Sequence, residues 1–349
     1  MVLIERFTTD TNKIYDLNTS PCNAREGEDQ PTMLENHVDM EDLWQSDPSK
    51  NYTKEDPVLA SFNVDKTTPI DESLWLLDQS IEKGNTTTGT IPKIIHKIYI
   101  EEKGTFPTLD NMKRFGSGSL EKAHASWKQH NPGYEIRIYN LHACRDYLRK
   151  YFHPVFLRAF DCIQSFANKA DFMRMAVMYR EGGWYSDWKQ ECLQEGLLDK
   201  LASNVTLYTV WDRGNDVSVR RKCMANSFFG AVKGHPLIAI QIRIMMEHIQ
   251  QKYYGQSTLH ATGPCAFGMA FQEYKKTFPE LQKYSRHGYH LGDLQIHSSP
   301  VARSESLILH KCERCGSDQN WKSGNNYNDL FAKKSYYCAD APSIFSSVE

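Results

Sequence analysis

The chain has 349 residues, of which 40% are hydrophobic and 24% are charged, as in a globular protein with one large domain plus an extension, or two smaller domains. Its formal net charge of −2 excludes a general electrostatic attraction to nucleic acid or acidic lipid. No apolar run approaches the roughly 18 residues that span a bilayer, and the N-terminus lacks the apolar core of a secretory signal. We therefore expect a cytoplasmic protein with no transmembrane segment and no nucleic-acid partner.

The first 88 residues are predicted to form a loosely structured N-terminal extension, because they are polar and rich in Asp, Thr, Asn and Lys. Their one periodic segment, ESLWLLDQSIEK at 72–83, has the spacing of a short amphipathic helix. The stretch GNTTTGT at 84–90 is typical of a linker. Residues 89–349 are expected to be the folded domain.

From residue 91 the pattern alternates between strands and helices. The expected strands are 91–100, 134–140, 184–188, 205–211 and 226–232, and the expected helices are 119–133, 143–152, 153–166, 168–183, 235–253 and 263–277. This alternation predicts an α/β fold with a mostly parallel sheet flanked by helices. Ligands of such sheets bind beyond the carboxyl ends of the strands, where Asp187 is expected.

The chain has nine cysteines, an odd number, and without an export signal we expect reduced thiols. Cys312 and Cys315 form a CERC motif, which with His310 and Cys338 has a spacing that a structural zinc site could use. Free thiols, a zinc site and a disulfide are the three alternatives for CERC.

Four stretches carry a resemblance. They are IPKIIHKIY at 91–99, ANKADFMRMAVMYREGGWYSD at 167–187, NSFFGAVKGHPL at 226–237 with ATGP at 261–264, and the late His310. Together they resemble the retaining GT-A glycosyltransferases with a DXD motif, a group that includes the glucosyltransferase domains of large clostridial toxins and the yeast outer-chain mannosyltransferases. The resemblance covers about residues 91–325 and implies a GT-A (Rossmann-like) domain that follows a polar extension.

The resemblance implies a role for each matching residue. Asp171 and Arg174, which lie on one face of a helix, would contact donor-sugar hydroxyls, although a surface ion pair is the alternative. Asp187 would contact ribose and metal. The implied donor-binding residues are Tyr99 (stacking on the nucleobase, or else core), Gly182 and Gly183 (close approach of the backbone), Tyr185, Thr262 and Gly263, whereas His96 is expected to be structural.

The sequence departs from the family at Lys189, which replaces the second acid of the motif Asp187-Trp188-Lys189. An ammonium offers no oxygen ligand to Mn²⁺ or Mg²⁺. Lys189 could itself neutralise the donor diphosphate; Asp187 and His310, with Gln190 or Glu191, could hold a weak metal; or the enzyme could be degenerate. We expect Mn²⁺ or Mg²⁺ to be weakly bound or dispensable.

The predicted function is a retaining glycosyltransferase reaction. A hexose would move from a UDP- or GDP-linked donor, with UDP favoured, to a glycan or other hydroxyl acceptor. The alternative is a catalytically inactive nucleotide-sugar or glycan-binding protein on the same fold. A third class, such as a phosphohydrolase, is disfavoured because no Gly-rich phosphate loop is present. Acceptor choice is expected to lie in the 104–130 and 212–224 loops.

Overall fold

The computed structural model describes residues 75–78, 89–101, 119–203, 205–212, 223–277, 282–285, 288–291, 294–297, 309–311 and 325–345. All of them lie in one of the two units of the chain, Lys50–Glu349. The domain boundary expected at residue 88 stays a prediction. Within the described residues, no helix combines the length and the hydropathy that crossing a membrane requires.

The described strands and helices follow the expected alternation. The strands are β1 Ile94–Ile98, β2 Glu135–Tyr139, β3 Gly183–Ser186, β4 Gln190–Cys192, β5 Leu207–Val210, β6 Phe228–Ala231, β7 Gln282–Ser285, β8 Gly288–Leu291, β9 Leu294–His297 and β10 Leu309–Lys311. The helices are α3 Ser119–His130, α4 Leu141–Tyr151, α5 Pro154–Cys162, α6 Phe166–Glu181, α7 Leu197–Leu201, α8 Pro236–Gln250, α9 Pro264–Thr277 and α11 Tyr327–Ala332, with a short 3-10 helix at Ala341–Phe345.

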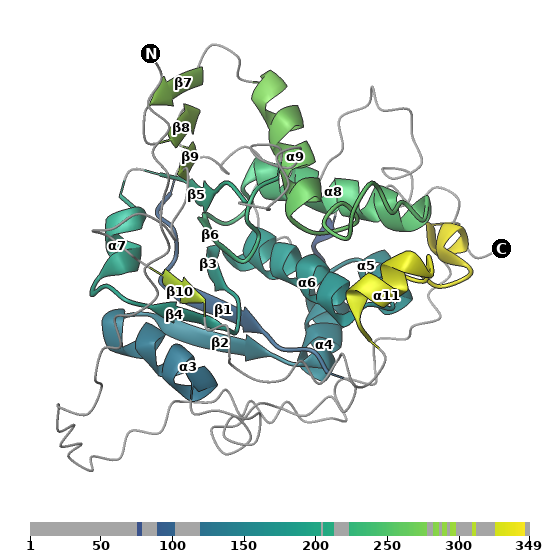
Figure 1. Ribbon diagram of the computed structural model, residues 1–349, viewed down its shortest axis with the longest axis horizontal. Helices are drawn as coiled ribbons and strands as arrows, with labels where there is room; N and C mark the ends of the chain where they lie inside the picture. The colour runs from purple at the N-terminus through teal and green to yellow at the C-terminus, as the bar shows by residue number, and fades with distance from the viewer. Residues whose placement is uncertain are drawn as a thin grey trace, which may run out of the picture. The chain divides into compact units, whose positions relative to one another are not determined.

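The main sheet has the strand order β2-β1-β3-β6-β5-β9-β8-β7. Parallel pairs join β1 to β2, β1 to β3 and β5 to β9, whereas β6 runs antiparallel to both β3 and β5. The strands follow this order up Figure 1, from β2 near the bottom to β7 at the top, with α3 and α7 on the left of the sheet and α6 and α8 on the right. The predicted α/β fold with a sheet flanked by helices is confirmed.

Alternation along the strands separates two hydrophobic cores. Trp184 and Phe228 pack with Trp127 of α3 on one face of the sheet. The Trp184 and Phe228 rings are stacked, with their centroids 5.6 Å apart. The next residues along the strands, Tyr185 and Phe229, point to the other face and join the larger core, to which α4, α5, α6, α8 and α9 contribute. Because side chains alternate along a strand, β3 sends Trp184 to the smaller core and Tyr185 to the larger one. The strand ends at Ser186, and Asp187 follows it.

The segment Trp75–Asp78 differs from the helix expected at 72–83. Leu76 instead forms an antiparallel bridge with Phe152, and Trp75 is fully buried against Phe156 and Tyr179. A buried tryptophan removes a large apolar area from water, and this term outweighs the local helical spacing. The prediction is therefore wrong over these described residues.

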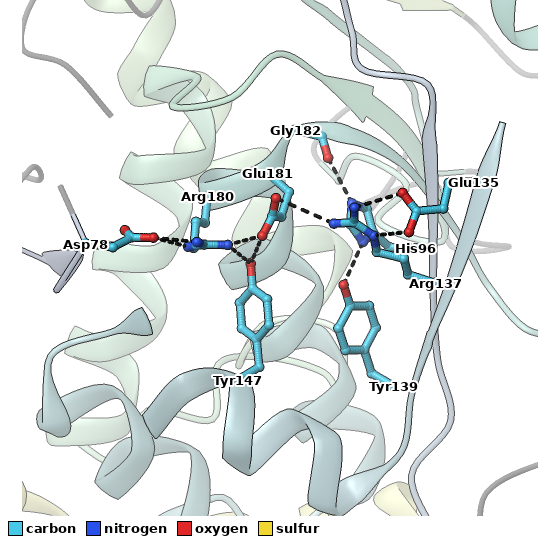
Figure 2. Close-up of polar contacts among 9 residues, drawn as sticks. All are labelled: Asp78, His96, Glu135, Arg137, Tyr139, Tyr147, Arg180, Glu181 and Gly182. Atoms are coloured by element: carbon cyan, nitrogen blue, oxygen red, sulfur yellow. Dashed lines mark hydrogen bonds and ion pairs between the residues drawn. The ribbon is translucent and has the colours of Figure 1, made fainter. Parts of the chain in front are cut away.

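A polar network fixes the corner where α6 meets β3 (Figure 2). Arg180 pairs with Asp78 and Glu181, and Tyr147 donates to Glu181 at 2.9 Å. The network continues through Arg137, Glu135, His96, Tyr139 and Gly182. Its charged groups pair with one another, so it anchors the Trp75–Asp78 segment to α6. The expectation that His96 is structural agrees with these contacts.

Two disulfides differ from the expected reduced thiols. Cys162 is bonded to Cys338, and Cys223 to Cys265. The partners are 176 and 42 residues apart, so the pairing depends on the folded topology. The CERC motif lies outside the described residues.

Candidate active site

The candidate site forms where α6 turns into β3. Ser165 caps the amino end of α6, and Gly182 ends the helix with a φ of 66°, a conformation that glycine adopts without a steric penalty. The helix places Asp171 and Arg174 on one face, as predicted from their spacing. β3 then carries the chain to Asp187 at its carboxyl end.

Asp171 is held by hydrogen bonds from distant parts of the chain. Its Oδ1 accepts from Asn226 Nδ2 at 2.8 Å, and its Oδ2 accepts from the Thr262 hydroxyl at 2.9 Å. Arg174 pairs with the same carboxylate at 3.2 Å. The alternative of a surface ion pair is therefore excluded, because Arg174 and Asp171 are only 7% and 15% exposed.

Arg174 links the two acids of the site. Its Nη1 donates to the Asn226 carbonyl at 2.6 Å and lies 3.4 Å from Asp187 Oδ1, which also accepts from the Tyr185 hydroxyl at 3.0 Å. The guanidinium carbon lies 4.4 Å from the centroid of the Tyr185 ring. Asp187 is 34% exposed, so it is the member of this cluster that a ligand reaches most readily.

The electrostatics keep Arg174 charged. Burial opposes its charge, but the neighbouring Tyr185 and the two carboxylates outweigh burial and raise the pKa of the guanidinium. Burial raises the pKa of Asp171, and Arg174 opposes that rise. Burial also raises the pKa of the Tyr185 hydroxyl, which is therefore protonated at neutral pH and donates to Asp187.

The ATGP loop closes the site above Asp171. The fully buried Thr262 accepts from Asn168 Nδ2 at 2.8 Å while it donates to Asp171. A methyl group built at Gly263 would lie 3.4 Å from the Asp171 carboxylate and 3.1 Å from the Leu259 carbonyl. Thr262 and Gly263 therefore border the carboxylate, and their implied role in donor binding stays a prediction.

A second set of contacts holds the turn after β3 from the other face of the sheet. Lys97 is fully buried, and its Nζ donates to Ser186 Oγ at 3.3 Å and to the Asp187 carbonyl at 3.4 Å. Burial lowers the pKa of Lys97 to about 7, and the charge of Asp187 opposes this shift. Trp127 donates to the Gln190 carbonyl at 2.7 Å.

Trp188, the middle residue of the turn, lies between two rings. Tyr99 at the end of β1 is 5.4 Å from it, and His124 of α3 is 5.8 Å from it, between ring centroids. Tyr99 is partly exposed beside the turn. Its predicted role with the nucleobase stays a prediction.

Gly182 and Gly183 are not part of this cluster. They lie at the amino end of β3, about 13 Å of extended chain from Asp187. A methyl group on Gly183 would meet the Ile94 carbonyl at 2.7 Å, and one on Gly182 would meet the Lys233 amide at 2.7 Å. Packing against neighbouring backbone groups therefore requires glycine at both positions.

The described carboxylates near the turn already have polar partners. Asp187 Oδ1 already contacts Arg174 and Tyr185, and Glu191 lies 3.4 Å from Lys122. Among the residues that the structure describes, no group of three His, Cys, Asp or Glu could hold a metal ion. The backbone of His310 pairs with Glu191 between β10 and β4, which brings it near the turn. Nothing is described of its side chain.

Sequence reasoning missed three polar residues of the site: Asn168, Asn226 and Lys97. Asn226 opens the stretch NSFFGAV and Lys97 lies within IPKIIHKIY, so both belong to segments that carry the resemblance. A polar residue within or beside an otherwise apolar strand segment was the signal that could have identified Asn226 and Lys97. Parts of both loops expected to choose the acceptor, 102–118 and 213–222, lie outside the described residues.

Residues 117–206 match the family described as the glycosyltransferase sugar-binding region containing the DXD motif. An uncharacterized glycosyltransferase of Acanthamoeba polyphaga mimivirus is 26% identical over 189 residues, which are 54% of this chain and 68% of that protein. Inositol phosphoceramide mannosyltransferase 2 of Schizosaccharomyces pombe is 27% identical over 199 residues, 56% of this chain and 51% of that protein. The chain spans about half the length of this second relative.

Two solved structures are similar at a lower level. PaToxG glycosyltransferase gives a TM-score of 0.40 at 18% identity, over 55% of this chain and 71% of that one. Mouse xyloside xylosyltransferase 1 gives 0.31 at 11% identity, over 70% of this chain and 93% of that one. The family match and the curated relatives confirm the resemblance to DXD-type glycosyltransferases. These matches support a transferase enzyme, and the family match itself covers residues 117–206.

Proposed function

We propose that the chain transfers a hexose from a UDP- or GDP-linked donor to a hydroxyl acceptor, with retention of anomeric configuration. A UDP-sugar is the favoured donor. The observation that carries the proposal is the buried Asp171–Arg174–Asp187 cluster at the carboxyl end of β3. Sugar hydroxyls require both acceptors and donors of hydrogen bonds, and this cluster offers two carboxylates and a guanidinium within one small volume.

Each acid has its own part in this proposal. Asp171, fixed by Asn226 and Thr262, accepts from donor-sugar hydroxyls. Asp187, the more exposed acid, accepts from the ribose. Arg174 holds both carboxylates in place, which provides the fixed geometry that group transfer requires.

Lys189 supplies the positive charge that stabilises the leaving diphosphate. An ammonium is a compact charge that pairs with phosphate oxygens, and it stands where the family's second acid would hold a cation. Mn²⁺ or Mg²⁺, if bound through Asp187 and His310, would add charge to the diphosphate but would be dispensable.

The second candidate is a catalytically inactive nucleotide-sugar or glycan-binding protein. Lys189 is the observation that favours it, because the substitution removes a residue that the family uses in the reaction. The two candidates differ in turnover: the binding protein would retain a nucleotide sugar without releasing its hexose.

We also propose a location. The sequence predicted the cytoplasm, but the Cys162–Cys338 and Cys223–Cys265 disulfides favour an oxidising compartment. Thiol titration of the denatured protein, purified without reductant, tests this. Four fewer reactive thiols than after reduction support the disulfides, and equal numbers would contradict them.

Hydrolysis of a panel of UDP- and GDP-sugars, measured as nucleotide release, tests the function. Wild type should release nucleotide from at least one donor, and Asp171→Asn should reduce the rate strongly. Tight binding of a donor without release, with or without candidate acceptors, would instead support the binding protein.

A further inference from the structure

Lys97 is a buried lysine that none of the roles above requires, and with a pKa lowered to about 7 by burial it is about half protonated at neutral pH and fully protonated below it. Its side chain is fully buried between β3 and α3, where the ammonium lies 5.2 Å from the centroid of the Trp127 ring. Its hydrogen bonds go to two uncharged oxygens, the Ser186 hydroxyl and the Asp187 carbonyl. Among the residues that the structure describes, no carboxylate lies within ion-pairing distance of it.

Such an arrangement opposes folding rather than supporting it. Removing an ammonium from water is unfavourable unless a counter-charge compensates, and two long hydrogen bonds to neutral oxygens compensate only in part. An apolar side chain of similar length would fill the same volume without this penalty. Packing alone therefore does not account for a lysine here.

The two oxygens do not require Lys97 either. The Asp187 carbonyl also accepts from the Gln190 amide at 3.0 Å, and the Ser186 hydroxyl donates to Gln190 Oε1 at 3.2 Å. Both groups would keep a partner if the ammonium were removed. The remaining property of Lys97 is its positive charge, placed directly beneath the turn that carries Asp187 and Lys189.

We propose that Lys97 is a positioning residue of the donor site, whose buried charge holds the Asp187–Gln190 turn in the conformation that binds a nucleoside diphosphate. The inference rests on the proposed function, because it assumes that an anionic donor binds at this turn. Charge-assisted hydrogen bonds are stronger than neutral ones, so the ammonium restrains the Asp187 backbone more firmly than a neutral group would. Its charge also favours an anion above the turn.

Two variants separate charge from hydrogen bonding. Lys97→Met removes both, whereas Lys97→Gln removes the charge but keeps an N–H donor, on a side chain one bond shorter. Lys93→Met is the matched control, because Lys93 is an exposed lysine of the same segment that pairs with Asp199 at 3.0 Å. Donor KM, kcat and the urea denaturation midpoint are measured for each.

Both Lys97 variants should raise the donor KM at least about tenfold and change kcat less than about threefold, since binding is what they weaken. Lys97→Met should denature at the same or a higher urea concentration than wild type. Lys93→Met should match wild type in all three quantities. A wild-type KM in Lys97→Gln, or a lower midpoint or failure to fold in Lys97→Met, would overturn the proposal.

Failure of the proposed function is recognised separately. If wild type hydrolyses no donor, the Kd values for UDP and GDP replace KM in the same comparison. Weaker nucleotide binding by Lys97→Gln than by wild type would still support the role of Lys97. Equal binding, or none by wild type, would overturn it.

Discussion

Arg174→Lys tests whether the guanidinium organises the site. Arginine reaches Asp171, Asp187 and the Asn226 carbonyl at once through its planar fork, at 3.2, 3.4 and 2.6 Å. Lysine keeps the charge but presents a single nitrogen, which reaches one or two of these oxygens. We expect the loss of about two hydrogen bonds to charged groups.

The magnitude follows from those contacts. A hydrogen bond to a charged group contributes about 1.5–3 kcal/mol, so the variant should lose roughly 3 kcal/mol of unfolding free energy. Displacement of both carboxylates should lower kcat/KM about 100-fold, which corresponds to about 2.7 kcal/mol of transition-state stabilisation. Urea denaturation measures the first quantity, and donor hydrolysis measures the second.

Arg145→Lys is the matched control, because Arg145 pairs with Asp161 at 2.9 Å on the surface, with side chains 42% and 35% exposed. Exposed ion pairs contribute about 0–1 kcal/mol, so this control should resemble wild type in both assays. If Arg174→Lys loses less than about 1 kcal/mol and keeps kcat/KM within about threefold, the reasoning about the fork is refuted.

Three further predictions concern metal, pH and packing. Lys189→Asp restores the second acid of the motif and should make turnover sensitive to EDTA; turnover that still survives EDTA would contradict this. Burial lowers the pKa of His96 to about 4 and of His235 to about 3. Both stay neutral in the fold while the unfolded chain takes up protons near pH 6.5, so stability should be full above that pH and fall by roughly 4 kcal/mol towards pH 5 in urea denaturation. His235→Asn should remove about 2 kcal/mol of that dependence, the share of one such histidine, and a stability independent of pH would exclude the mechanism. Gly183→Ala should lower the unfolding free energy by at least about 2 kcal/mol, because Gly183 has a φ of 99° and an added methyl would meet the Ile94 carbonyl; a wild-type denaturation midpoint would exclude that strain.

The parts of the site that depend on local spacing could be predicted from the sequence. Asp171 and Arg174 lie three residues apart within a strongly helical stretch, so their shared face followed from helix geometry. The two glycines indicated the end of that helix, and Asp187 followed the next strand. The alternation of strands and helices was sufficient for the α/β class.

The parts that depend on the folded topology could not be predicted in this way. Asn226 contacts Asp171 across 55 residues of sequence, and the Cys162–Cys338 bond spans 176 residues. Lys97 is buried within β1, and the polar groups that it meets there come from β3 and the turn after it, which the sequence of β1 does not specify. The burial of Trp75 was not predicted, because it depends on a surface formed by Phe156 of α5 and Tyr179 of α6.

Hydrolysis of the donor panel with Mn²⁺, and again with EDTA, tests the central claim most directly. We expect wild type to release nucleotide from a UDP- or GDP-sugar at comparable rates under both conditions, because Lys189 supplies the charge. Turnover that requires Mn²⁺ would contradict this account of Lys189 and assign the charge to a metal held through Asp187. Absence of release from every donor, with and without acceptors, would contradict the proposed transferase activity itself.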